Sequence, residues 1–319
     1  MLITVFDTRI CDNNLGNQII MDSVDAVLKK MFPQAFFVPL PYLDSIGKEA
    51  CAYVKASNYT FFGGTNALSS EMRTYRQWGL DSDIAGRISG VVLLGVGWWQ
   101  YQDVPDDYTR NILRNVLHPE HYHSVRDSFT ARQLQAAGFQ NVFNTGCPTL
   151  WPLTPEHCAS IPVDKAEDVL LTFTCYRQNP EIDRKLAEIL KKMYRNVYYW
   201  IQSPGDAAYI SHILPDAKIV GPRLEYLDAI LASPLDIEYV GTRLHAGVRA
   251  MQHRRRTTII EVDNRAREMR LDFKLPSIPR EEILSLEVRL NGEFKTELTM
   301  PWRTIDNWKQ QFADAAVSA

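Results

Sequence analysis

Short apolar runs alternate with amphipathic segments from the start of the chain. Residues 2–6 (LITVF) form an apolar run, and the apolar side chains of 19–32 follow helical spacing. The same alternation predicts strands at 59–62, 91–97 and around 123–127. A helix over SFTARQLQAA follows, and Gly138 ends it. This order of elements indicates a parallel sheet covered by helices on both faces.

A second series of alternating elements begins after the proline-containing stretch 147–167. The predicted strands are DVLLTFT, VYYWIQS, AKIVG, DIEYVG and TTIIEVD, and the predicted helices are 181–194, 223–232 and one that starts near Leu244. We therefore predict an α/β fold of two Rossmann-like domains, 1–160 and 161–319, that face an interdomain cleft. The stretch 301–316 predicts a terminal helix that crosses back to the first domain, with one apolar face: Trp302, Ile305, Trp308 and Phe312.

Composition narrows the functional classes. The net charge of -3 argues against a nucleic-acid partner, so binding of an anion must be local. Five cysteines without a CxxC pair indicate reduced thiols in a cytoplasmic protein. No basic leader precedes the first apolar run, and no uncharged apolar stretch has transmembrane length. We expect a soluble protein that could still contact the inner face of a membrane.

Arginines stand where two predicted strands end. GTRLHAG places Arg243 and His245 directly after DIEYV, and SVRD places Arg126 before Asp127. Strand ends are where open α/β sheets build ligand sites, and arginine binds phosphate and carboxylate groups bidentately. The pattern suggests an anionic substrate and acid-base chemistry. The alternatives are a core histidine in the first stretch and an ion pair of Arg126 with Asp127, while Asp127 or Ser128 caps the next helix.

Glycines follow three further strands or turns, in NNLGNQ (13–18), FFGGTN (61–66) and LLGVGWW (93–99). None fits the GxGxxG or GxxxxGK[ST] pattern, which weakens the case for a dinucleotide or ATP. NNLGNQ could place backbone amides against an anion at the start of a helix, but taken alone it favours an ordinary strand-to-helix turn. Trp98 and Trp99 suit either a sugar-binding face or a packed core.

Two basic or histidine-rich runs suggest other sites. HPEHYH contains His118, His121 and His123, but lacks the further ligands of a metal site, so a polar loop is favoured. HRRRTT at 253–258 predicts a solvated turn, with contact to anionic lipid head groups as the alternative. We expect neither a metal nor a cofactor.

The ordered motifs NLGNQ, FFGGTN, LLGVG, SVRDSFTARQLQAAGF, NTGCPTLW, GTRLHAG and TIIEVDNRARE resemble the polysaccharide pyruvyl transferase family, from about residue 13 to about residue 270. The resemblance implies an architecture similar to GT-B glycosyltransferases and transfer of the enolpyruvyl unit of phosphoenolpyruvate to a sugar of a polysaccharide or of its lipid-linked precursor, which makes a pyruvate ketal. It implies an acceptor side in the first domain and a donor side in the second.

Carried over residue by residue, the resemblance makes His245 the general acid and assigns substrate binding to Arg243, Arg126, Asn14, Gly16, Asn17, Gly63, Gly64 and Asn264. Many members have aspartate where this chain has Asn17, and a third glycine where it has Thr65. A GT-B glycosyltransferase that uses a nucleotide sugar and an inactive binding or scaffold relative are the rival functions.

Overall fold

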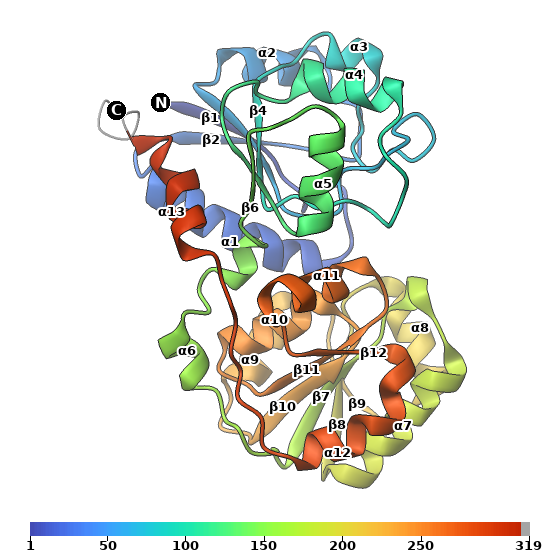
Figure 1. The fold of residues 1–319 in the computed structure, drawn as a ribbon. Coiled ribbons are helices and arrows are strands. Elements are labelled where there is room, and N and C mark those ends of the chain that lie inside the picture. The colour runs from blue at the N-terminus through green and yellow to red at the C-terminus, as the bar shows by residue number, and fades with distance from the viewer. Residues whose placement is uncertain (314–319) are drawn as a thin grey trace. The chain divides into compact units, whose positions relative to one another are not determined.

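The structure, a computed structural model, describes residues 1–313, which form two compact units (Figure 1). Unit 1 comprises Met1–Asp12, Ile20–Pro148 and the chain from Met300 on, and unit 2 comprises Asn13–Ile19 and Thr149–Thr299. The predicted boundary at residue 160 falls inside unit 2.

Unit 1 is built on parallel strands. β1 (Leu2–Phe6), β2 (Phe36–Leu40), β3 (Tyr59–Gly63) and β4 (Val91–Leu94) form one sheet in the order β2-β1-β3-β4. β5 (His123–Val125) and β6 (Val142–Asn144) pair in parallel, and Gly95 N–H donates to the Ser124 carbonyl at 2.9 Å to join them to the segment after β4. The helices are α1 (Leu15–Met31), of which residues 15–19 belong to unit 2, and α2 (Lys48–Ala56), α3 (Ser82–Ala85), α4 (Asp107–Val116), α5 (Ser128–Ala136) and α13 (Trp302–Gln310).

Unit 2 has a sheet in which all strand pairs are parallel. Its order is β12-β11-β10-β7-β8-β9, formed by β7 (Asp168–Thr172), β8 (Asn196–Trp200), β9 (Lys218–Val220), β10 (Ile237–Gly241), β11 (Thr257–Glu261) and β12 (Ser277–Pro279). This is the Rossmann strand order, which reverses direction between β7 and β10. The helices are α6 (Pro155–Ala159), α7 (Pro180–Met193), α8 (Pro204–Ile213), α9 (Leu224–Ala232), α10 (Leu244–Gln252), α11 (Asn264–Phe273) and α12 (Leu286–Asn291), and the short 3-10 turns are η1 (Pro148–Leu150), η2 (Cys175–Arg177) and η3 (Arg280–Ser285).

The predicted α/β class with parallel sheets is confirmed. Every residue of β7, β10 and β11 is buried, as expected for strands covered on both faces. β2 was not predicted: its sequence FFVPL contains Pro39 and starts with the 77% exposed Phe36. β2 is an edge strand, where proline is tolerated and apolar side chains are not all buried.

The C-terminal helix α13 belongs to unit 1. Trp308 is buried, and the ring of Phe312 packs edge-on against Tyr59 at 5.2 Å and Phe61 at 5.3 Å. These contacts use the predicted apolar face. Positions 314–316 of the predicted helix lie outside the described residues.

The arginine run before β11 corrects one expectation. Arg256 is buried and pairs with Glu238 at 3.1 Å, and Arg255 donates to the carbonyls of Leu231, Ser233 and Leu235. The predicted solvated turn is wrong for these two arginines, because both guanidinium groups satisfy polar groups of the fold. Trp98 is fully buried, so the core interpretation holds for it.

Candidate active site

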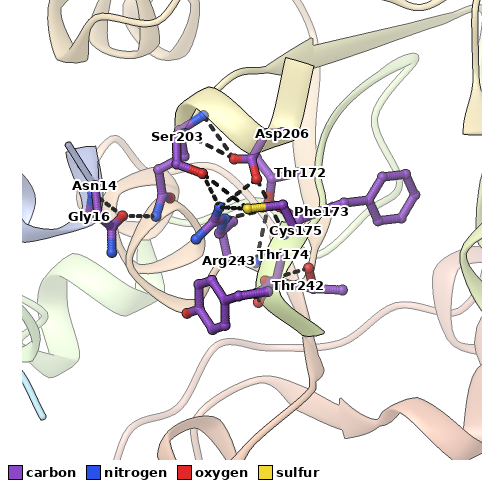
Figure 2. Close-up of polar contacts among 12 residues, drawn as sticks. Asn14, Gly16, Thr172, Phe173, Thr174, Cys175, Ser203, Asp206, Thr242 and Arg243 are labelled. Carbon is purple, nitrogen blue, oxygen red and sulfur yellow. Dashed lines mark hydrogen bonds and ion pairs between the residues drawn. The ribbon is translucent and has the colours of Figure 1, made fainter. Parts of the chain in front are cut away.

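The switch point of unit 2 brings the ends of β7 and β10 side by side. Gly241 pairs with Thr172, and a side chain at Gly241 would come within 2.5 Å of the Thr172 hydroxyl. Just beyond the strands, Thr174 Oγ1 bonds to Thr242 at 3.1 Å (carbonyl) and 2.8 Å (hydroxyl) (Figure 2). Crevices outside such strand ends bind ligands in open α/β sheets.

Arg243 lies at this point and is held by several groups. Its Nε donates to the Phe173 carbonyl at 2.9 Å, and its Nη2 donates to Ser203 Oγ at 2.6 Å and to Asp206 Oδ1 at 2.5 Å (Figure 2). Nη2 also lies 3.7 Å from Cys175 Sγ. Among residues 1–313, no partner lies within hydrogen-bond distance of Nη1.

The charge of Arg243 is stabilised although its side chain is only 2% exposed. Burial acts against the charged form, but the Asp206 carboxylate and other neighbours outweigh it, so the pKa of Arg243 is raised. The guanidinium group is therefore always charged, and its hydrogen bonds to the protein fix its orientation.

Asp206 organises the loop around Arg243, and the sequence analysis missed it. Its carboxylate accepts from the backbone N–H of Cys175 at 3.3 Å, Gln202 at 3.2 Å and Ser203 at 3.1 Å, besides the arginine. With Ser203 it forms a capping box at the start of α8. The spacing Ser-Pro-Gly-Asp after a predicted strand is the signal that would have identified it.

His245 is the second residue of α10, whose N-cap is Arg243. It is 6% exposed. The Tyr239 hydroxyl donates to the Arg243 carbonyl at 2.7 Å and bonds to Thr172 Oγ1 at 2.5 Å, which anchors the start of α10 to both central strands. These bonds fix the backbone position of His245, and with it the point from which the imidazole side chain extends.

The predicted residues Asn14, just before α1, and Gly16 and Asn17, in its first turn, also belong to unit 2. Asn14 Oδ1 accepts from Gly16 N–H at 3.0 Å and from Gln202 Nε2 at 2.8 Å. A side chain at Gly16 would lie 2.8 Å from the Gln202 amide nitrogen, so glycine permits this contact. Asn17 N–H donates to the Asn14 carbonyl at 2.9 Å. The structure therefore brings Asn14 and Gly16 to the end of β8, next to Ser203.

Asn264 begins α11 and is buried, directly after the N-cap Asp263. Arg265 pairs with Asp263 at 2.6 Å and donates to the Tyr176 hydroxyl at 2.6 Å. Tyr176 lies in η2, next to Cys175, and its ring centroid is 5.2 Å from Arg243 Cζ. Tyr176 and Arg265 are site residues that the sequence analysis did not identify.

The other predicted arginine, Arg126, lies in unit 1. All three guanidinium nitrogens have partners: Nε donates to Asp127 at 2.9 Å, Nη1 to Asn66 Oδ1, and Nη2 to the Trp98 carbonyl at 3.4 Å. Asp127 also caps α5. The ion pair weighed as an alternative is present.

Gly63 and Gly64 in unit 1 pack against α1. A side chain at Gly63 would lie 2.8 Å from Val24, and one at Gly64 would overlap Ile20. Gly64 has φ +63, and Thr65 after it has φ +58, a left-handed conformation that is unfavourable for a β-branched residue. The third glycine of the family motif thus coincides with a position where glycine would remove strain.

Within residues 1–313, no three His, Cys, Asp or Glu side chains gather as a metal site. His118 and His121 stack on each other at 4.1 Å, while both ring nitrogens of His123 bond to backbone groups. No helix in the same range is long and apolar enough to span a membrane.

The protein is thus an α/β protein of two units, and in unit 2 a buried arginine and a buried histidine follow the strand at which the strand order reverses. The family model of polysaccharide pyruvyl transferase matches residues 14–229. The chain belongs to this family and is a transferase. No curated protein matches the chain.

Solved structures that are similar share little sequence with the chain. UDP-GlcNAc 2-epimerase from Neisseria meningitidis bound to UDP-GlcNAc is 10% identical, with a TM-score of 0.47 over 100% of both chains. LpCGTa in complex with UDP is 11% identical, with a TM-score of 0.44 over 99% of this chain and 94% of that one. The E. coli heptosyltransferase WaaC with ADP-2-deoxy-2-fluoro heptose is 11% identical, with a TM-score of 0.38 over 82% and 88%.

Proposed function

We propose that the protein transfers the enolpyruvyl unit of phosphoenolpyruvate to a sugar of a polysaccharide or of its lipid-linked precursor, forming a pyruvate ketal. The observation that carries the proposal is Arg243, a buried cation fixed by Asp206 whose Nη1 remains available. The donor presents a phosphate and a carboxylate, which are the groups that a fixed guanidinium binds best. Because phosphoenolpyruvate is an intracellular metabolite, the enzyme would act in the cytoplasm, at the inner face of the membrane when the acceptor is lipid-linked.

His245 is the general acid of this proposal, since it follows Arg243 by two residues at the start of α10. Its proton goes to the methylene carbon of the donor, which becomes a methyl group and leaves the central carbon electrophilic. One sugar hydroxyl adds to that carbon. The second hydroxyl displaces phosphate and closes the ring, so that one of the two hydroxyl protons replaces the one His245 gave and the other leaves with phosphate.

The remaining predicted residues extend the proposal. Asn14, Gly16, Asn17 and Asn264 lie in the same unit as Arg243 and His245, and we propose them as further substrate contacts. Arg126, Gly63 and Gly64 lie in unit 1 and remain candidates for substrate binding.

The test is incubation with phosphoenolpyruvate and a panel of sugar acceptors, with phosphate release and product mass both measured. We expect equimolar phosphate and a product heavier than the acceptor by one pyruvate less water. Binding and turnover of a nucleotide sugar, with no use of phosphoenolpyruvate, would assign the protein to glycosyl transfer.

Arg243→Lys tests the donor site. Lysine keeps the charge but cannot reproduce the contacts of Nε, Nη1 and Nη2 together, so donor affinity should fall roughly ten- to hundredfold. Calorimetry with phosphoenolpyruvate measures this. The control is Arg249→Lys, since Arg249 lies on the same helix and pairs with Asp228 at 2.6 Å. Equal affinity in both variants would remove Arg243 from donor binding.

A further inference from the structure

Tyr176 is an exposed aromatic ring in the turn that follows β7. It is 53% exposed, whereas Phe173 and Thr174 just before it are buried. A single exposed aromatic residue is ordinary on a protein surface. What sets Tyr176 apart is how the surrounding residues restrain it at the candidate site.

Two arginines hold the ring. Arg265 Nη2 donates to the Tyr176 hydroxyl at 2.6 Å, and Arg265 is itself fixed by Asp263 at 2.6 Å. The Arg243 guanidinium carbon lies 5.2 Å from the ring centroid, within the range of a cation–π contact. An exposed side chain normally keeps its rotamer freedom, and here that freedom is given up without burial of the ring.

Such a restrained, half-exposed ring is suited to bind a flat apolar surface. The C–H face of a pyranose provides one, and an aromatic residue offers large contact area at little conformational cost because it is already ordered. The location also fits, since Arg243 is the donor-binding residue of the proposed function. An acceptor hydroxyl has to reach a donor bound at Arg243, and a sugar ring stacked on Tyr176 would lie beside the Arg243 guanidinium group.

We propose that Tyr176 is the platform on which the pyranose ring of the acceptor sugar stacks. This inference rests on the proposed function for the identity of the acceptor. Tyr176 is a specificity-determining residue here: it positions the sugar, while proton transfer belongs to His245.

Unit 2 offers a matched control in Tyr226. Tyr226 is 48% exposed and also lies near an arginine, with Arg223 Cζ 5.7 Å from its ring centroid. It belongs to α9, which follows the edge strand β9 and not one of the two central strands. Tyr176 and Tyr226 thus share their exposure and an arginine neighbour, but Tyr176 follows a central strand and Tyr226 follows an edge strand.

The experiment measures binding of methyl glycosides of galactose, glucose, mannose and N-acetylglucosamine by saturation-transfer NMR, with phosphoenolpyruvate present and absent. Tyr176→Ala should weaken the best-bound glycoside roughly three- to tenfold, because stacking on an aromatic ring is lost. Tyr226→Ala should stay within about twofold of wild type, since its ring lies elsewhere. Tyr176→Phe keeps the ring but loses the bond to Arg265, so it should weaken binding less than Tyr176→Ala does. Melting temperatures show whether each variant is folded.

The outcomes separate this inference from the proposed function. Tyr176-dependent glycoside binding without any binding of phosphoenolpyruvate supports the platform and rejects the donor assignment. Phosphoenolpyruvate binding with equal glycoside affinity in Tyr176→Ala and Tyr226→Ala rejects the platform alone. Absence of saturable binding by every glycoside also overturns it.

Discussion

Each unit places one arginine and one histidine near the end of a strand, and the surroundings give the two pairs different characters. In unit 1, His123 opens β5 and Arg126 follows it; in unit 2, Arg243 follows β10 and His245 lies on α10. Arg126 has partners on all three guanidinium nitrogens, while Arg243 keeps Nη1 available. An arginine at a strand end is therefore not by itself a ligand site, because its neighbours in the fold decide which of its nitrogens are already bonded.

The histidine of unit 1 is held by the fold. His123 is fully buried, accepts from Leu93 N–H at Nδ1 and bonds to the His118 carbonyl through Nε2. Burial lowers its pKa to about 4, so it is neutral at physiological pH. A neutral histidine with both nitrogens bonded is a structural group, so His123 is not a candidate for proton transfer.

The largest expected effect is on turnover. His245→Gln should lower kcat by roughly 10² to 10⁴ with donor affinity retained, because a positioned general acid contributes about that factor. Phosphate release in single-turnover reactions measures it. His253→Gln is the control, since His253 lies just after the same helix and pairs with Asp228 at 3.2 Å. Near-normal turnover of His245→Gln would place the proton donor elsewhere.

Next in size is the loss of stability when the unit 1 arginine is removed. Arg126→Ala leaves the buried Asp127 carboxylate without its cation, which should lower the free energy of unfolding by about 3–5 kcal/mol. Urea denaturation measures this. Arg110→Ala breaks an exposed pair with Asp107 and should cost less than about 1 kcal/mol. Similar unfolding free energies for the two variants would mean that Arg126 is not a structural group.

His123 should make stability depend on pH. Its folded pKa lies below its unfolded value of 6.5, so the unfolded chain takes up the proton first as pH falls. The stabilisation is complete above pH 6.5 and is lost towards pH 4, by on the order of 3 kcal/mol. Urea denaturation between pH 7.5 and 4.5 measures the slope. His123→Gln should flatten it, and an unchanged slope would assign the dependence to other groups.

The smallest effect concerns strain beside the glycines of unit 1. Thr65→Gly should raise the free energy of unfolding by about 1 kcal/mol, because φ +58 costs a β-branched residue more than the added chain entropy of glycine. Lys274→Gly, at φ 56 but without branching at Cβ, should gain less. Thermal unfolding compares them. A destabilised Thr65→Gly variant would show that contacts of the threonine side chain outweigh the strain.

The strands were predictable because buried parallel strands are continuous apolar runs, as in DVLLT and VVLL. The edge strand with Pro39 lacks that signal. For the site, GTRLHAG and SVRD looked alike, since each puts an arginine after an apolar run. What separates them is supplied by distant segments: Asn66 reaches Arg126, and Ser203 with Asp206 reaches Arg243. Spacing in one stretch cannot reveal such partners.

Unit 1 takes its last helix from the end of the chain, and this constrains the order of folding during synthesis. Unit 2 draws all but seven of its residues from the continuous stretch Thr149–Thr299, so it can assemble as soon as that stretch leaves the ribosome. Unit 1 stays incomplete until α13 emerges, and until then the rings of Tyr59 and Phe61 lack the cover of Phe312. The N-terminal half of the protein would thus finish folding last, with an apolar surface open to chaperones in the interval.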